Sequence, residues 1–204
     1  VLDFYGKKIE ALPTSVTIGI KETKEMIEEA KGYRALGFRV LKIKTGHHAE
    51  EDIESVRMLK EAYGDTFTIR VDANQGYTIA ALQQFIRATK AYGVELIEQP
   101  LKVGLEIQLQ QLSAEERVQL VADESLLDAA SASQLSHPPQ PYGVYNIKLM
   151  KAGGIHQSRE IGTIAKHAGI SLFWGCNDES IVSITAALHA AYSCSNTRYI
   201  DLDG

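Results

Sequence analysis

The chain has few cysteines, few aromatic residues and no excess of basic charge. Its two cysteines, Cys176 and Cys194, fit no metal-binding spacing and are too few for a disulfide framework. With 21 Lys and Arg against 26 Asp and Glu, a net charge of -5 gives no basic surface for nucleic acid. No apolar run approaches the roughly 18 residues that span a bilayer, and nothing resembles a signal peptide. We therefore expect a cytoplasmic protein that binds neither nucleic acid nor a membrane.

Eight short apolar segments recur along the chain at nearly constant intervals. Their last residues lie 24 to 29 positions apart, which is the length of one strand, one helix and two short loops. The predicted strands are Val16–Ile20, Val40–Lys44, Thr68–Ala73, Glu95–Gln99, Val118–Asp123, Tyr145–Leu149, Ser171–Gly175 and Arg198–Leu202.

The segments between the predicted strands have the pattern of helices. Ile53, Val56 and Leu59 fall at near-helical spacing and would form one apolar stripe facing a sheet. Glycine precedes several strands, as expected where a left-handed residue ends a helix. These glycines are Gly37, Gly64, Gly93 and Gly169. The proline-containing segment Ser131–Pro141 is the one connection that departs from the pattern.

Strands that alternate with helices predict parallel pairing, because parallel neighbours need crossover connections of about this length. The first strand is followed by no glycine-rich phosphate loop, which favours a (β/α)8-type barrel over an open doubly wound sheet. Eight strands and seven helices correspond to the form (β/α)7β. The intervals contain no long linker, so we predict a single α/β barrel domain over residues 1–204.

Charged residues occupy one face of six predicted strands. Lys42 and Lys44 alternate with apolar Leu41 and Ile43, and an edge strand with solvated lysines is the simple alternative. The same alternation recurs on later strands, where helices would cover the apolar face and turn the charged face inward. The predicted inward residues are Lys42, Lys44, Arg70, Asp72, Asn74, Glu98, Asp123, Asn146, Lys148, Asp201 and Asp203.

Three carboxylates, Asp72, Glu98 and Asp123, end three successive strands. They would repel one another unless a cation lay among them. Hard oxygen ligands with positions left for water or substrate suit Mg2+. The histidines and thiolates that zinc favours do not occupy these strand ends.

Five motifs in order resemble the enolase superfamily, in its muconate-lactonizing-enzyme subgroup. They are Lys42–Lys44, Val71–Asn74, Ile97–Pro100, Ala122–Ser125 and Asn146–Gly154. The resemblance implies one Mg2+ held by Asp72, Glu98 and Asp123. It also implies acid/base catalysis by Lys44 and Lys148 on opposite faces of the substrate, with Lys42 as an auxiliary cation. Asn74 and Asn146 are expected to support these groups.

The family resemblance also implies a capping domain built from sequence outside the barrel. This chain contains neither part of such a domain, so we expect the catalytic barrel of a longer protein. A truncated or degenerate barrel that binds metal without turnover is the non-enzyme alternative. Lys148 argues against a mandelate-racemase-like member, in which histidine would be expected as one base.

The eighth predicted strand indicates the substrate. Its Asp-x-Asp, Asp201 and Asp203, resembles the dipeptide epimerases of the subgroup, such as L-Ala-D/L-Glu epimerase, in which it receives the α-ammonium. Cys176 and Asn177, after the seventh strand, are predicted substrate contacts. N-succinylamino-acid racemase, o-succinylbenzoate synthase and muconate cycloisomerase are the enzyme alternatives. In a purely structural alternative the two aspartates only close the barrel or pair with lysines. The sequence leaves the oligomeric state open, with a homo-oligomer among the alternatives.

Overall fold

The computed structural model describes residues 1–203, which form two compact units. One unit comprises residues 15–120, and the other comprises residues 1–14 together with the segment from Val121 onward. The single domain predicted for residues 1–204 stays a prediction. Gly204, the last residue of the eighth-strand motif, lies outside the described residues.

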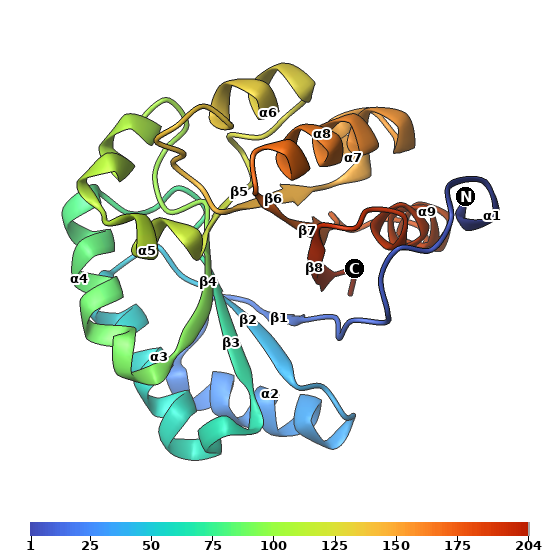
Figure 1. The fold of residues 1–204 in the computed structure, drawn as a ribbon. Coiled ribbons are helices and arrows are strands. Elements are labelled where there is room, and N and C mark those ends of the chain that lie inside the picture. The colour runs from blue at the N-terminus through green and yellow to red at the C-terminus, as the bar shows by residue number, and fades with distance from the viewer. Residues whose placement is uncertain (204) are drawn as a thin grey trace. The chain divides into compact units, whose positions relative to one another are not determined.

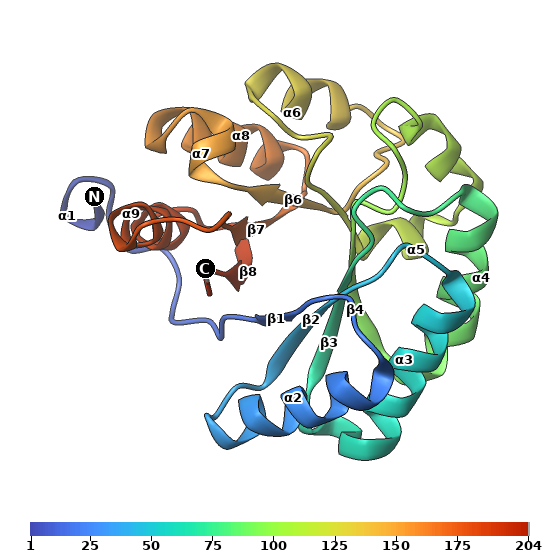
Figure 2. The ribbon, with the colours of Figure 1, turned by 180° about the vertical axis from the view of Figure 1, so that it is seen from behind.

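In the unit of residues 15–120, four strands pair in parallel and in chain order (Figure 1). The strands are β1 (Val16–Ile18), β2 (Val40–Lys44), β3 (Thr68–Asp72) and β4 (Val94–Glu98). The helices are α2 (Thr23–Ala35), α3 (Ala49–Tyr63), α4 (Ile79–Thr89) and α5 (Ala114–Val118). Three short 3-10 helices are η1 (Gly64–Thr66), η2 (Lys90–Tyr92) and η3 (Glu106–Gln111). Helices α2, α3 and α4 run along the same side of these strands (Figures 1 and 2).

The helix boundaries in this unit follow local sequence signals. The backbone amide of Ala81 donates to the Thr78 hydroxyl at 3.2 Å and caps α4. Leu82 and Phe85 of α4 are fully buried, as an apolar stripe that faces the strands requires. The four glycines predicted to end helices, three in this unit and Gly169 in the other, all have positive φ angles. The angles are 95° at Gly37, 53° at Gly64, 65° at Gly93 and 73° at Gly169.

The second unit also has four parallel strands in chain order. They are β5 (Leu120–Ala122), which begins at the unit boundary, β6 (Val144–Ile147), β7 (Ser171–Gly175) and β8 (Thr197–Asp201). The helices are α1 (Leu2–Tyr5), α6 (Ala129–Leu135), α7 (Leu149–Ala152), α8 (Ile155–His167) and α9 (Ile181–Tyr192). Helix α1 lies beside α9 in both views (Figures 1 and 2), and the Lys8 amide donates to the Tyr192 carbonyl at 2.7 Å.

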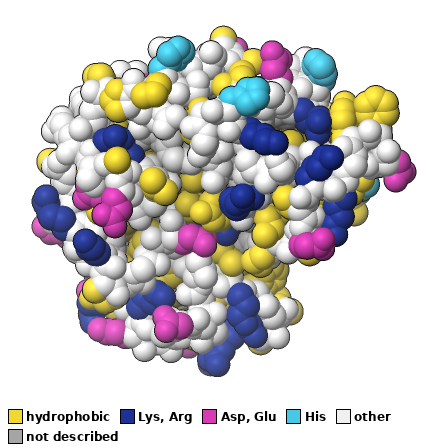
Figure 3. Space-filling view, in the orientation of Figure 1, with side chains coloured by type: hydrophobic (Ala, Val, Ile, Leu, Met, Phe, Trp, Pro, Cys, Tyr) yellow, Lys and Arg dark blue, Asp and Glu magenta, His cyan; other side chains and the backbone are white. Residues whose placement is uncertain are grey.

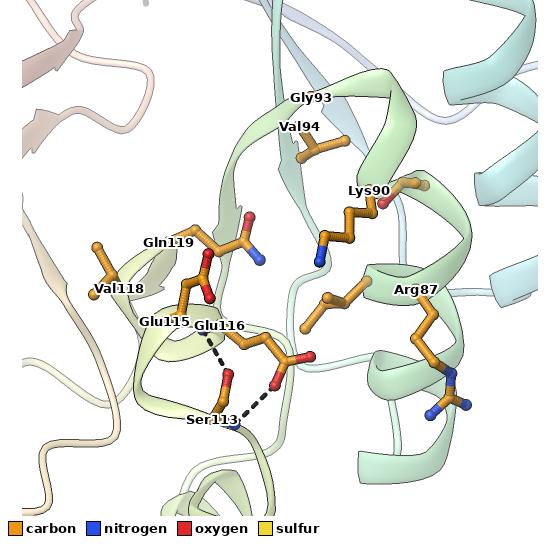
Figure 4. Close-up of a pocket in the computed structure, with 11 residues that line it drawn as sticks. Arg87, Lys90, Gly93, Val94, Ser113, Glu115, Glu116, Val118 and Gln119 are labelled. Carbon is orange, nitrogen blue, oxygen red and sulfur yellow. Dashed lines mark hydrogen bonds between the residues drawn. The ribbon is translucent and has the colours of Figure 1, made fainter.

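Three predicted strand boundaries were wrong by two residues. The strand predicted to end at Ile20 ends at Ile18. The strand predicted from Val118 begins at Leu120, because Ser113 and Glu116 form a capping box that starts α5 and extends it through Val118 (Figure 4). The strand predicted to end at Leu149 ends at Ile147, and Leu149 opens α7. The segment between β4 and β5, one of those predicted to be helical, contains the two short helices η3 and α5.

The irregular segment Ser131–Pro141 divides into two parts. Its first residues belong to α6, which an Asp128–Ser131 capping box starts, and the Pro138–Pro139 peptide bond is cis. Within residues 1–203, none of the helices has both the length and the apolar character of a membrane span. Acidic and basic side chains are interspersed over the face seen in Figure 3.

Candidate active site

The carboxyl ends of β2, β3 and β4 bring three predicted site residues into one row. Lys44 lies opposite Asp72 on the neighbouring strand, and Asp72 lies opposite Glu98. Residues paired in this way point to the same face of a sheet, so the shared face predicted for these three residues is confirmed. Asp72 and Glu98 are each only 1% exposed. Two carboxylates on adjacent strands are therefore buried side by side.

Lysines provide the compensating charge in this unit. The Lys44 ammonium donates to Asp72 Oδ2 at 2.7 Å and to Asn74 Oδ1 at 2.9 Å. The backbone N–H of Asn74 in turn donates to Asp72 Oδ1 at 3.0 Å. Lys42 Nζ lies 3.7 Å from Glu98 Oε2, and both side chains are buried. Each buried carboxylate of the row thus faces a lysine of β2, as burial of a charge requires.

A second lysine–carboxylate group lies in the other unit. Asp123 directly follows β5, and Lys148 directly follows β6. The Lys148 ammonium donates to Asp123 Oδ2 at 2.8 Å. Lys151 donates to Asp123 Oδ1, to the Asp123 carbonyl at 2.6 Å and to the Asn146 carbonyl at 3.3 Å. Both lysines therefore converge on one carboxylate that is 4% exposed.

Lys151 belongs to this lysine–carboxylate group, and the sequence did not single it out. Its only signal was a position three residues after Lys148, and the two are separated by the start of α7. Burial by itself would raise the pKa of Asp123, but the charges of Lys151 and Lys148 hold that pKa below its usual value. Asp123 is consequently kept as an anion in a buried place.

The predicted substrate residues at β7 and β8 differ in exposure. Asp201 is 2% exposed and lies opposite Gly175, while Asp203 is exposed. The Cys176 thiol donates to the Asp201 carbonyl at 3.4 Å. Asn177 is exposed, and its backbone N–H donates to Glu179 Oε1 at 2.9 Å. The structure therefore brings Cys176 to Asp201.

Asn146 is fully buried and lies against β7. A Cβ atom added to Gly175 would lie 2.6 Å from Asn146 Oδ1, so only glycine fits beside this amide. Asn146 also accepts the Lys151 hydrogen bond through its carbonyl. It therefore packs at the junction of β6 and β7, next to the lysines that bind Asp123.

The unit of residues 15–120 contains one pocket away from the predicted site residues and one pocket beside Lys44. A pocket of about 540 Å³ is lined by α4, α5 and the first residue of β4, and Arg87, Lys90 and Glu116 are among its lining residues (Figure 4). It lies at the end of β4 opposite Glu98 and contains none of the predicted site residues. A second pocket of about 470 Å³ is lined by Lys44 and by the beginnings of α2 and α3.

The donor set of the three carboxylates consists of hard oxygens, which suits Mg2+. The unit of residues 15–120 contains Asp72 and Glu98, and the other unit contains Asp123. Within residues 1–203, no group of three His, Cys, Asp or Glu side chains is arranged as a metal site. In this structure the carboxylate oxygens instead receive lysine ammonium groups.

Comparison with known proteins identifies the family. The model of the enolase C-terminal domain-like family matches residues 25–203. The chain belongs to this family. An L-Lys-D/L-Arg epimerase of Desulforapulum autotrophicum is 50% identical over 204 residues, which are 100% of this chain and 57% of that protein. An L-Lys-D/L-Arg epimerase of Methylococcus capsulatus is 48% identical with the same coverage. The chain thus spans little more than half the length of these family members.

Crystal structures of family members confirm the predicted fold class. The dipeptide epimerase from Methylococcus capsulatus, complexed with Mg and the dipeptide L-Arg-D-Lys, matches with a TM-score of 0.97 and 48% identity. The match covers 100% of this chain and 57% of that one. The dipeptide epimerase from Enterococcus faecalis, complexed with Mg and L-Leu-L-Tyr, matches with a TM-score of 0.85 and 39% identity over 94% of this chain and 54% of that one. The predicted enolase-superfamily resemblance and (β/α)8-type fold are therefore correct.

Proposed function

We propose that the full-length protein is a Mg2+-dependent dipeptide epimerase. In this reaction the configuration at the α-carbon of the second residue of a dipeptide is inverted by a 1,1-proton transfer between two lysines. The observation that carries the proposal is a repeated arrangement: Lys44 is bonded to Asp72, and Lys148 is bonded to Asp123. Each predicted base thus touches a predicted metal ligand. Epimerase activity of the relatives named above supports the same reaction type.

Asp72, Glu98 and Asp123 would hold the metal. When bound, Mg2+ would stabilise the negative charge that develops on the substrate carboxylate as the α-proton leaves. The three residues fit this role because they are buried carboxylates at strand ends, with no softer ligand among them. Asn74 supports the group from this chain, since it bonds both Lys44 and Asp72.

Lys44 and Lys148 would move the proton. One lysine removes the proton from the α-carbon, and the other returns a proton to the opposite face, which inverts the stereocentre. Lys42, whose Nζ lies 3.7 Å from Glu98 Oε2, would provide positive charge beside that carboxylate. Lysine has a flexible stem, so each ammonium can leave its carboxylate and reach a bound substrate.

The substrate would be held at its amino end by Asp201. This carboxylate is buried, so an ammonium group that reaches it makes a strong charge-assisted hydrogen bond. Two relatives that are 50% and 48% identical are named for L-Lys and L-Arg, which makes cationic dipeptides the first substrates to test. N-succinylamino acids and muconate carry anionic groups that would be repelled at Asp201.

The test uses full-length protein with Mg2+ in D2O. L-Lys-L-Arg and its epimer at the second residue are each followed by NMR for exchange of the α-proton. We expect deuterium to enter as the configuration inverts. Lys44→Ala and Lys148→Ala should each block exchange from one epimer and leave exchange from the other. Turnover near the wild-type rate in both directions in either variant would rule out the two-base scheme.

Two controls accompany this experiment. Lys24→Ala, which changes an exposed lysine of α2, should leave both exchange rates unchanged. The N-acetylated dipeptide lacks the α-ammonium and should react much more slowly, because loss of a desolvated charge pair costs on the order of 2–5 kcal/mol. Equal rates for the free and acetylated peptides would contradict the dipeptide assignment. Turnover of N-succinylamino acids instead would favour the racemase alternative.

A further inference from the structure

The loop after β2 and the loop after β3 touch through their backbones. Gly46 has a φ of 100°, and a Cβ atom there would lie 2.1 Å from the Ala73 carbonyl oxygen. A Cβ atom at Gly76 would lie 2.1 Å from the Gly46 carbonyl oxygen. Such distances leave no room for any other residue at either position. The two loops are thus packed against each other immediately beyond Lys44 and Asp72.

One carboxylate joins these two loops. Asp52, in the first turn of α3, accepts a hydrogen bond from the Gly46 amide at 2.9 Å and another from the Tyr77 hydroxyl at 2.7 Å. Both bonds end on the same oxygen, Oδ2. Tyr77 is 5% exposed, and its ring packs against Phe85 of α4 at 5.6 Å between ring centroids. Asp52 therefore connects α3, the loop after β2 and the loop after β3.

The position of Asp52 is not explained by helix electrostatics alone. Glu50 and Glu51 lie in the same first turn, are exposed and already provide negative charge near the helix N-terminus. Asp52 is instead partly buried, and burial raises the pKa of its carboxyl despite the bonds from Gly46 and Tyr77. Burial also raises the pKa of Tyr77, so its hydroxyl stays a donor. A partly buried acceptor that receives hydrogen bonds from two specific donors indicates a positional role.

The loops after β2 and β3, which Asp52 joins, lie directly beside the Lys44 side chain and its partners. Its ammonium binds Asp72, the last residue of β3, and Asn74, which lies in the loop after β3. The backbone of Lys44 leads directly into Thr45 and Gly46. The Thr45 amide also donates to the Asp72 carbonyl at 2.8 Å. A shift of either loop would therefore move the lysine relative to its partners.

We propose that Asp52 is a positioning residue that fixes Lys44 for proton transfer, an inference that rests on the proposed function. Asp52 acts by holding the loop that follows Lys44 against the loop that follows Asp72. Lys148 and Asp123 belong to the other unit and are not held by this carboxylate. Loss of Asp52 should therefore impair the proton transfer of one lysine and spare that of the other.

The experiment measures α-proton exchange of both epimers in full-length Asp52→Ala. Exchange from the epimer that depends on Lys44, identified by Lys44→Ala, should fall by about 100-fold, as expected for a misplacement of roughly 1 Å. Exchange from the other epimer should stay within about twofold. A purely structural role would slow both epimers together. Asp52→Asn keeps an acceptor oxygen and should retain most of the wild-type rate.

Two further variants keep the test informative. Tyr77→Phe removes one of the two donors but keeps the ring, so it should slow the Lys44-dependent epimer selectively and by less than Asp52→Ala. Glu51→Gln is the matched control, because it changes a charge in the same helical turn without touching Gly46 or Tyr77. If Asp52→Ala does not fold, Tyr77→Phe decides the question. If α-proton exchange slows equally for both epimers, or slows for neither epimer, the positioning role is wrong.

A measurement without turnover separates this inference from the proposed function. Hydrogen exchange of the Gly46 amide, followed by NMR, should accelerate in Asp52→Ala and stay near wild type in Asp52→Asn. If wild-type protein exchanges the α-proton of neither epimer, the proposed function fails and the positioning role fails with it. If wild type is active and Gly46 loses protection without any selective kinetic effect, only the positioning role is wrong.

Discussion

Asp72 and Glu98 lie directly opposite each other on the adjacent parallel strands β3 and β4. Both carboxylates are almost fully buried, and like charges in this arrangement are destabilising without a cation. Lys44 and Lys42 provide cations within this unit, at 2.7 Å from Asp72 and 3.7 Å from Glu98. Either a lysine or a bound Mg2+ can therefore neutralise these carboxylates.

Lys42→Met should destabilise the Mg2+-free full-length protein by about 3–5 kcal/mol, because breaking a buried ion pair leaves Glu98 without its cation. Saturating Mg2+ should recover part of that loss if the metal binds Glu98. Urea denaturation with and without Mg2+ measures both effects. The control is Lys31→Met, which breaks the exposed Lys31–Glu28 pair and should cost less than about 1 kcal/mol. Equal costs for the two variants would contradict the prediction.

Asp201→Asn should raise KM for a free dipeptide and have little effect on an N-acetylated one. The buried Asp201 carboxylate is expected to bind the ammonium more strongly than the exposed Asp203, where water screens the charge. Steady-state kinetics of full-length Asp201→Asn and Asp203→Asn with both peptides provide the measurement. A larger KM change in Asp203→Asn would show that the exposed aspartate is the main contact.

Gly46→Ala should destabilise the protein by about 2–4 kcal/mol, since the new Cβ would meet the Ala73 carbonyl and the positive φ disfavours alanine. Gly19→Ala is the matched control, because a Cβ there meets no atom within 4 Å. That variant should change the free energy of unfolding by less than about 1 kcal/mol. Urea denaturation of the two variants tests the close approach of the loops, which similar stabilities would refute.

Glu116→Gln should lower stability at pH 7 by about 0.3–1 kcal/mol, because glutamine can still complete the capping box but removes a negative charge from the first turn of α5. The effect should be smaller in acid. The hydrogen bond from the Ser113 amide, at 2.7 Å, lowers the pKa of Glu116 in the folded protein. A lowered pKa stabilises the fold at pH values above the unfolded pKa of about 4.3. This contribution is lost as the pH falls through the folded value.

Urea denaturation from pH 7 into acid measures this change. Glu115→Gln, at the exposed neighbour, should show a smaller difference because the capping box uses Glu116. A constant effect of Glu116→Gln across the pH range would mean that its ionisation contributes nothing to the cap.

The sequence by itself determined most of the strands and helices, and the face of each strand on which its side chains lie. Eight strands, the glycines that end helices and the charged face of β2 depend on periodicity and on φ preferences, which act over a few residues. The boundaries of β5 and β6 were predicted less well. There, the capping box at Ser113 and the start of α7 at Leu149 shortened segments whose apolar residues also suit a strand.

Only the tertiary structure decided which side chains meet. No role of its own was predicted for Lys151 from the sequence, but the fold brings its ammonium to Asp123 and to the Asn146 carbonyl. Asp52 was one of several acids at the start of a helix until the two loops around Gly46 and Tyr77 met at its carboxylate. Strand register and loop packing set such contacts between residues far apart in the chain. Local periodicity carries no information about them, because it is the same for every register that keeps the apolar face buried.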